Sequence, residues 1–233
     1  MCRAAAGKMV EACRIVASQA IVASHHNSEI RDEFLRWNLA FPVAVKNLLR
    51  SEPGTPGELA GVLSVADSDA LLSAAQQPLH CLQMMRMSAF EMAATSPQDP
   101  TLAAVQHDGI DGSLAALSGA MNAMERLNNT PQPFAYAAHV RVLLLAYLLF
   151  LAVYLQPFCG WLTPPAVAFV SFALVGTETA ATECERPFKR RPDHLPLERY
   201  CLVAADNVVQ LLATQAVAAA RAQRRAWLRP GHV

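Results

Sequence analysis

The sequence predicts an all-α, multi-pass membrane protein with a transmembrane helical hairpin and a helical extramembrane part. From Val142 to Thr177 the chain contains no Asp, Glu, Lys, Arg or His. Elsewhere apolar residues recur at helical spacing, and no stretch shows the period of two that is typical of a strand. Of all residues, 53% are hydrophobic and 16% are charged, whereas an average soluble domain is roughly 25% charged. This deficit indicates either a large buried core or a membrane segment.

The N-terminal part of the chain is expected to form helices separated by short loops. Residues 1–24 are rich in Ala and Val at helical spacing, which predicts a first helix. Ser28 offers the start of a second helix, and Pro42 should kink or divide it. The Pro and Gly residues of 51–58 predict a loop.

Two further helices are expected before the uncharged stretch. Ser68 or Asp69 can cap one that continues into residues 80–92, and a loop follows at 95–101. Ser113 precedes the other, in which one helical face contains Leu114, Leu117, Met121, Met124 and Leu127.

The uncharged stretch predicts two apolar helices joined by a tight turn. Residues 156–165 interrupt it with three prolines and a glycine. If the helices extend outward to Phe134 and Cys184, each has about 20 residues, enough to cross a hydrocarbon core of about 30 Å. The uninterrupted apolar cores are short, so a buried hairpin in a soluble helical core is the alternative.

Charge predicts the topology of this hairpin. Its turn is uncharged, whereas both outer ends are basic, with His139 and Arg141 before it and Arg186, Lys189, Arg190 and Arg191 after it. Lys and Arg gather on the cytoplasmic side of membranes, so both ends should lie on that side, with Tyr136 and Trp161 at the interfaces. The four basic residues after the hairpin could contact anions or lipid headgroups, or could determine topology alone. The expected regions are 1–128 (helical, cytosolic or stromal side), 129–185 (hairpin) and 186–233 (basic segment and C-terminal cytosolic helix).

The segment "ERLNNTPQPFAYAAHVRVLLLAYL" and the stretch from "GWLTPP" to "LERYC" resemble the bestrophin family of anion channels, in its bacterial and plant-type branch. The residues that match family motifs are Asn129, Thr130, Pro131, Pro133, Tyr136, Trp161, Pro164, Glu178, Glu185, Pro187, Phe188, Asp193 and Pro196. The resemblance covers most of residues 1–215 and is densest over 125–203.

This resemblance implies a homopentameric subunit that conducts chloride or other small anions passively, without a cofactor, and that contacts membrane lipids. A thylakoid location in chloroplasts is one expectation and the plasma membrane is another. The family's first pair of membrane helices, which lines the pore neck, is expected before residue 1, so no neck residue is assigned. Animal members bind calcium just after the Pro-Phe pair, but here Arg191 and His194 stand at the clasp positions, and calcium binding is not expected.

Two finer predictions concern single residues. The resemblance suggests a cytosolic aperture near Gly112 and Leu114, with core packing of Leu114 as the alternative. Arg141 and Glu178 lie 19 and 18 residues from Gly160 at the apex, so antiparallel helices would bring them to nearly the same depth. We expect them to pair, or else to act as independent interfacial anchors.

Several function classes are disfavoured. The formal net charge is zero, so no electrostatic attraction to nucleic acid is indicated. No C-x-x-C pair or other metal-ligand spacing and no nucleophile or phosphate-binding motif occurs, so neither a metal site nor an enzyme is expected. The alternatives to a channel subunit are a non-conducting membrane scaffold, an incomplete channel fragment and a soluble helical binding protein.

Overall fold

The structure is a computed structural model, and the residues that it describes are 2–24, 27–97, 99–130, 134–184, 188 and 195–227. The chain forms two compact units. One contains Met1–Glu125 and Arg190–Val233, and the other contains Arg126–Lys189. The described elements are helices, apart from one isolated bridge between Ala60 and Leu63. The predicted all-α fold class is therefore confirmed.

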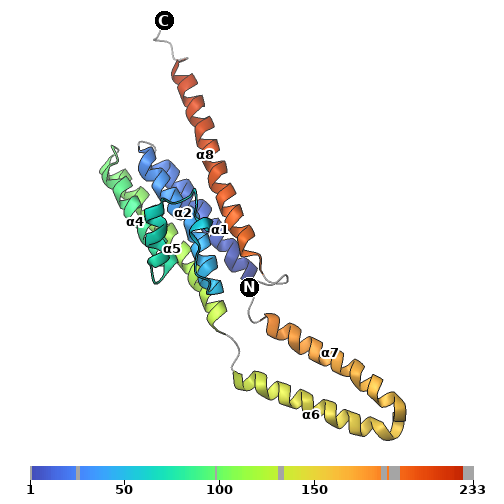
Figure 1. The fold of residues 1–233 in the computed structure, drawn as a ribbon. Helices are drawn as coiled ribbons and strands as arrows, with labels where there is room; N and C mark the ends of the chain where they lie inside the picture. The colour runs from blue at the N-terminus through green and yellow to red at the C-terminus, as the bar shows by residue number, and fades with distance from the viewer. Residues whose placement is uncertain are drawn as a thin grey trace. The chain divides into compact units, whose positions relative to one another are not determined.

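The first unit is a bundle around helix α2. Its elements are α1 (Cys2–Ala23), α2 (Ser28–Arg50), η1 (Pro56–Glu58), α3 (Val65–Ser73), α4 (Gln77–Ala94), most of α5 (Pro100–Asn129) and α8 (Leu197–Trp227). Helix α2 packs against α1, α4 and α8, and α8 also runs along α1 (Figure 1). The C-terminal helix thus belongs to the same bundle as the first two helices.

Helix α2 begins and continues for clear local reasons. Oδ1 of Asn27 accepts hydrogen bonds from the backbone N–H groups of Glu29 and Ile30, so Asn27 is the N-cap and Ser28 is the first helical residue. Pro42 lies inside the helix and does not divide it. The chain is buried on both sides of Pro42, since Phe41 before it is fully buried and Val45 after it is 1% exposed.

The core of this unit is mainly apolar and includes a polar link between α1 and α2. Its largest fully buried side chains include those of Phe34, Trp37, Phe41, Met85, Leu117 and Met124. Asn38 is also buried, and its amide donates to the carbonyl oxygen of Cys13 over 3.1 Å. This bond satisfies a buried donor and connects α2 to α1.

The helix expected after residue 68 is two helices, and its predicted cap was wrong. Ser64, not Ser68 or Asp69, caps α3: its hydroxyl accepts from the N–H of Asp67 and donates to the Asp67 carboxylate. This reciprocal pair resembles a capping box. Ser68 lies buried inside α3, and residues 74–76 separate α3 from α4.

Helix α5 starts at Pro100, whereas this helix was expected to begin after Ser113. Pro100 occupies its first position, and the carboxylate of Asp99 accepts from the N–H of Thr101 over 2.9 Å. Pro is favoured at the first helical position, because its missing N–H would have no partner there. The Ser113 hydroxyl donates to the carbonyl oxygen of Gly109, as in a helix interior.

The second unit contains the hairpin. Helix α6 (Phe134–Cys159) and helix α7 (Thr163–Cys184) pack side by side and are joined by the 3-10 turn η2 (Gly160–Leu162), as Figure 1 shows. Gly160 has a φ of +49°, a conformation that glycine adopts without strain. The connection is thus shorter than the predicted turn over 156–165.

Candidate functional site: the α6–α7 hairpin and its charged pair

The hairpin exposes a continuous apolar surface. Leu149 is 71% exposed, Phe150 75% and Phe172 82%. Other large apolar side chains exposed on the hairpin are those of Val142, Leu143, Leu145, Tyr147, Val153, Tyr154, Phe158, Leu162, Phe169 and Val175. Two packed helices cannot cover so many apolar groups, and water is a poor environment for them. This surface suits lipid.

Two stretches of the described chain are long and apolar enough to cross a membrane. They are Ala135–Ala181, which spans the hairpin, and Leu197–Arg221, which lies in α8. The second is amphipathic in its packing, because Leu197, Ala204 and Val208 are buried in the first unit. Helix α8 is therefore long and apolar enough to cross a membrane, but in this structure it packs against α1 and α2.

Arg141 and Glu178 meet across the hairpin. Nε of Arg141 donates to Oε1 of Glu178 over 2.6 Å, and the two side chains are 55% and 20% exposed, respectively. They bracket the uncharged stretch, one in α6 and one in α7. An unpaired charge in a membrane helix costs about 2.5–3.5 kcal/mol at the centre and less near the interface. The ion pair lowers this cost at the base of the hairpin.

The motif residues at the hairpin ends lie where chain direction changes or helices begin. Trp161 is 95% exposed in the apical turn, and Pro164 lies in the first turn of α7. Tyr136, near the start of α6, is 60% exposed. An aromatic residue exposed at each end of the span is the arrangement that membrane interfaces favour.

Other predicted positions lie around the helix ends. Asn129 is the last residue of α5, and the hydroxyl of Thr130 donates to the carbonyl oxygen of Arg126 over 2.7 Å. Phe188 is fully buried, whereas Pro196 is exposed just before α8. The remaining predicted positions fall outside the described residues: Pro131, Pro133, Glu185, Arg186, Pro187, Lys189, Arg190, Arg191, Asp193 and His194.

The two aperture candidates differ in exposure. Leu114 is fully buried in α5, so its side chain packs against other residues of its own chain. The burial favours the alternative of core packing. Gly112 is exposed, and a Cβ at this position would meet open space. Gly112 alone of the two is therefore available to a pore surface.

Sequence reasoning missed an ion-pair cluster between α2, the following loop and α8. Arg50 donates from both terminal nitrogens to the carboxylate of Glu198, and Nη2 lies 2.9 Å from Oε2. Nζ of Lys46 lies 2.6 Å from Oε1 of Glu58, and the Asn47 amide donates to Oε2. Arg50 and Glu198 are 148 residues apart, so no local pattern indicates their pairing.

The Arg50 contact changes the acidity of Glu198. The hydrogen bonds and positive charge of Arg50 lower the pKa of Glu198 from 4.5 to about 2. Nearby, burial raises the pKa of the Cys201 thiol to about 11, so this thiol stays protonated and inert at neutral pH. Among the described residues, no group of three or more His, Cys, Asp and Glu side chains could hold a metal ion.

Comparison with known proteins places these features in a family. The model of the bacterial/fungal bestrophin protein family matches residues 2–210. A voltage-dependent anion channel-forming protein of Nostoc sp. is 32% identical over 216 residues, which cover 90% of this chain and 68% of that protein. A chloroplastic voltage-dependent chloride channel of Arabidopsis thaliana is 26% identical over 191 residues, or 80% of this chain and 44% of that protein.

A solved structure shares the fold. The crystal structure of a bacterial bestrophin homolog from Klebsiella pneumoniae superposes with a TM-score of 0.80 at 20% identity, over 90% of this chain and 76% of that one. The matched region in sequence and in structure includes both the bundle and the hairpin, since it covers nine tenths of the chain. The chain therefore belongs to the bacterial/fungal bestrophin family and is a membrane protein.

Proposed function

We propose that this chain is the subunit of an anion channel that lets chloride or other small anions cross a membrane passively. The observation that supports this most strongly is the 32% identity, over 90% of the chain, to a protein named as anion channel-forming. A family of this kind points to a channel role rather than to catalysis. The chain spans 68% of the Nostoc relative and 58% of an anion channel-forming relative from Salmonella typhi, so the activity of the whole protein is inferred.

The hairpin supplies the membrane-embedded part of the proposed subunit. Its exposed apolar side chains would face lipid, and the Arg141–Glu178 pair would neutralise the two charges that bracket the span. A carboxylate paired in this way repels a passing anion less than a free carboxylate does. One hairpin encloses no pore, which favours a homo-oligomer, and we propose a pentamer around a central pore.

Conduction in this proposal follows from dehydration and charge. Anions would shed part of their hydration shell at an apolar constriction, while basic side chains at the pore mouths raise the local anion concentration. Of the two positions predicted for the cytosolic aperture of the pore, we keep the exposed Gly112 in this proposal. Arg186, Lys189, Arg190 and Arg191 are proposed to contact anions or lipid headgroups.

The compartment is a separate part of the proposal. The Arabidopsis relative is named chloroplastic, which favours a chloroplast membrane such as the thylakoid, with the plasma membrane as the alternative. Fractionation of cells that express a tagged chain, with markers for both membranes, separates the two.

Anion flux in liposomes tests the channel proposal against a non-conducting scaffold. The chain, extended by the pair of membrane helices that the family resemblance predicts before residue 1, is purified and reconstituted into vesicles loaded with a chloride-sensitive dye, with empty vesicles as the control. We expect chloride entry above that of empty vesicles, and no matching entry of potassium. Vesicles that contain the inserted protein but admit no chloride would favour the scaffold. Release of the chain from membranes by carbonate would instead favour a soluble binding protein.

A further inference from the structure

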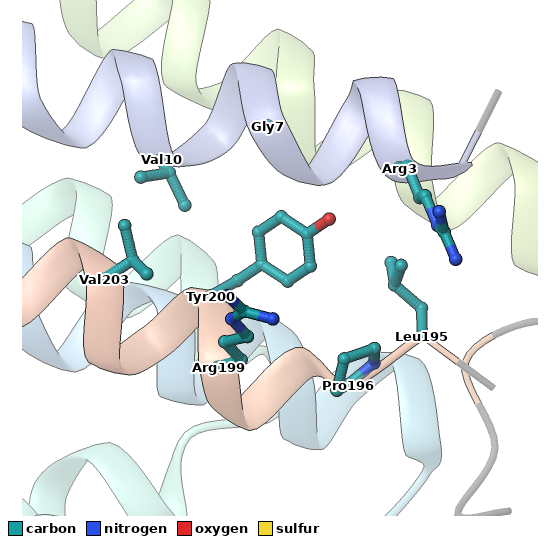
Figure 2. A pocket seen from close by; sticks show the side chains of 8 residues that line it. All are labelled: Arg3, Gly7, Val10, Leu195, Pro196, Arg199, Tyr200 and Val203. Atoms are coloured by element: carbon teal, nitrogen blue, oxygen red, sulfur yellow. The ribbon is translucent and has the colours of Figure 1, made fainter. Parts of the chain in front are cut away.

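A groove of about 490 Å³ lies between the beginning of α1 and the beginning of α8. Arg3, Gly7 and Val10 line it from α1, and Leu195, Pro196, Arg199, Tyr200 and Val203 line it from the start of α8 (Figure 2). Its volume falls within the range of ligand pockets. All eight residues belong to the first unit, so the groove is a feature of the bundle itself.

The groove is positively charged. Arg3 and Arg199 contribute two guanidinium groups, and none of the eight lining residues is acidic. In the described part of the chain, neither arginine forms an ion pair. Glu198, the neighbour of Arg199, is already held by both terminal nitrogens of Arg50. Within the part of the chain that the structure describes, the groove therefore presents two cations that no carboxylate contacts.

The remaining surface of the groove is apolar with one hydroxyl. In Figure 2 the ring of Tyr200 lies between the two helices, with its hydroxyl toward Arg3, and Val10 and Val203 face each other at the other end. Gly7 adds no side chain, and a Cβ there would meet open space. Arg3 and the Tyr200 hydroxyl thus lie toward one end of the groove, Arg199 lies beside the base of the Tyr200 side chain, and Val10 and Val203 line the other end.

We propose that this groove binds an anionic amphiphile, with its phosphate or carboxylate headgroup at Arg3 and the Tyr200 hydroxyl, Arg199 beside it along the groove, and its acyl chain along Val10 and Val203. Guanidinium groups pair with phosphate and carboxylate through charge-assisted hydrogen bonds. The Tyr200 hydroxyl donates a further bond to the headgroup. An inorganic anion would satisfy the arginines but leave the apolar end in water, so the tail is part of the recognition. This site is independent of the hairpin and of conduction.

Native mass spectrometry of the full chain, released from a neutral detergent, tests the proposal. The probes are phosphatidate and phosphatidylcholine with identical acyl chains, and inorganic phosphate as the free anion. The double variant Arg3→Gln/Arg199→Gln removes both cations. The matched control is Arg14→Gln/Arg221→Gln, which removes one exposed arginine from each of the same two helices. Gly7→Leu keeps both cations and fills the groove.

We expect the wild type and the control to retain phosphatidate in preference to phosphatidylcholine. The Arg3/Arg199 double variant should bind phosphatidate at least about tenfold more weakly, the factor expected for losing hydrogen bonds to a charged group. Gly7→Leu should also lose binding, with its helix content unchanged by circular dichroism. Equal losses in the groove and control variants would overturn the proposal. So would equal retention of the two lipids, or displacement of phosphatidate by an equal concentration of inorganic phosphate.

Discussion

At the scale of single residues, the Arg141–Glu178 pair closes the uncharged stretch of the hairpin at its base. The two side chains meet at 2.6 Å in an otherwise uncharged hairpin. Arg141→Glu and Glu178→Arg each place two like charges together, and the double exchange restores opposite charges. We expect each single variant to reduce the membrane-inserted yield and the double variant to recover much of it, as measured by carbonate extraction. Additive losses in the double variant would show two independent anchors instead.

The Arg50–Glu198 pair makes stability depend on acidic pH. The pKa of Glu198 is about 2 in the folded protein and 4.5 ordinarily, so the pair contributes fully above about pH 4.5. Its contribution is lost as the pH falls toward 2. Glu198 is half exposed, and solvent screening limits the effect, so Glu198→Gln should destabilise the bundle by about 1 kcal/mol at pH 7.

Thermal unfolding in a neutral detergent checks this prediction. The difference between wild type and Glu198→Gln should shrink as the pH is lowered from 4.5 to 2. Asp206→Asn removes an exposed carboxylate from the same helix and should leave the melting temperature nearly unchanged. A constant difference between wild type and Glu198→Gln across this pH range would show that the pair has no electrostatic role.

Leu114 tests core packing against a pore role. Because the side chain is fully buried, Leu114→Ala should destabilise the protein by about 2–5 kcal/mol. In the channel extended by the membrane helices expected before residue 1, relative permeability to large anions should stay unchanged. Leu102→Ala, at a position 48% exposed in the same helix, is the control and should have little effect on stability. Altered permeability with unchanged stability would return Leu114 to the aperture.

At the scale of elements, the hairpin was predictable and several helix boundaries were not. Its signal is the absence of charge over 142–177, which depends on no distant contact. The start of α5 was missed because Ser113 resembles a cap, although Asp99 and Pro100 form the actual N-terminus. The break between α3 and α4 was missed because helical periodicity continues across residues 74–76.

The candidate site was predictable to a similar extent. The pairing of Arg141 with Glu178 was predictable because the two residues lie at nearly equal sequence distances from the apex of the hairpin. The pairing of Arg50 with Glu198 was not, because it depends on how α2 and α8 pack. The groove between α1 and α8 was not predictable either. It joins Arg3 and Arg199, which only the tertiary fold brings to one place.

Exposed leucines of α6 and α8 can be used to test which of the two helices lies in lipid and which lies in water. Leu149 in α6 is 71% exposed and Leu202 in α8 is 65% exposed. An arginine near the middle of a membrane helix costs about 2.5–3.5 kcal/mol, whereas a surface substitution in water usually changes stability by about 0.5 kcal/mol or less. Leu149→Arg should therefore strongly reduce the membrane-inserted yield, and Leu202→Arg should not. Equal yields for the two variants would place both helices in the same environment.

At the scale of the whole molecule, the chain combines a helical bundle, in which ion pairs connect helices, with an apolar hairpin. The bundle contains its own core and the Arg50–Glu198 link. The hairpin has almost no core of its own and depends on lipid to cover it. The proposal of a membrane-embedded anion channel depends on this apolar hairpin and on membership of the bestrophin family.

The reversal potential of the reconstituted protein tests this proposal most directly. The chain, extended by the two membrane helices expected before residue 1, is fused into a planar bilayer that separates unequal concentrations of potassium chloride, and the voltage at which the current is zero is measured. We predict that this voltage lies close to the equilibrium potential of chloride and moves with it when the gradient is reversed. A reversal potential close to that of potassium, or no current from protein shown to be inserted, would contradict the account.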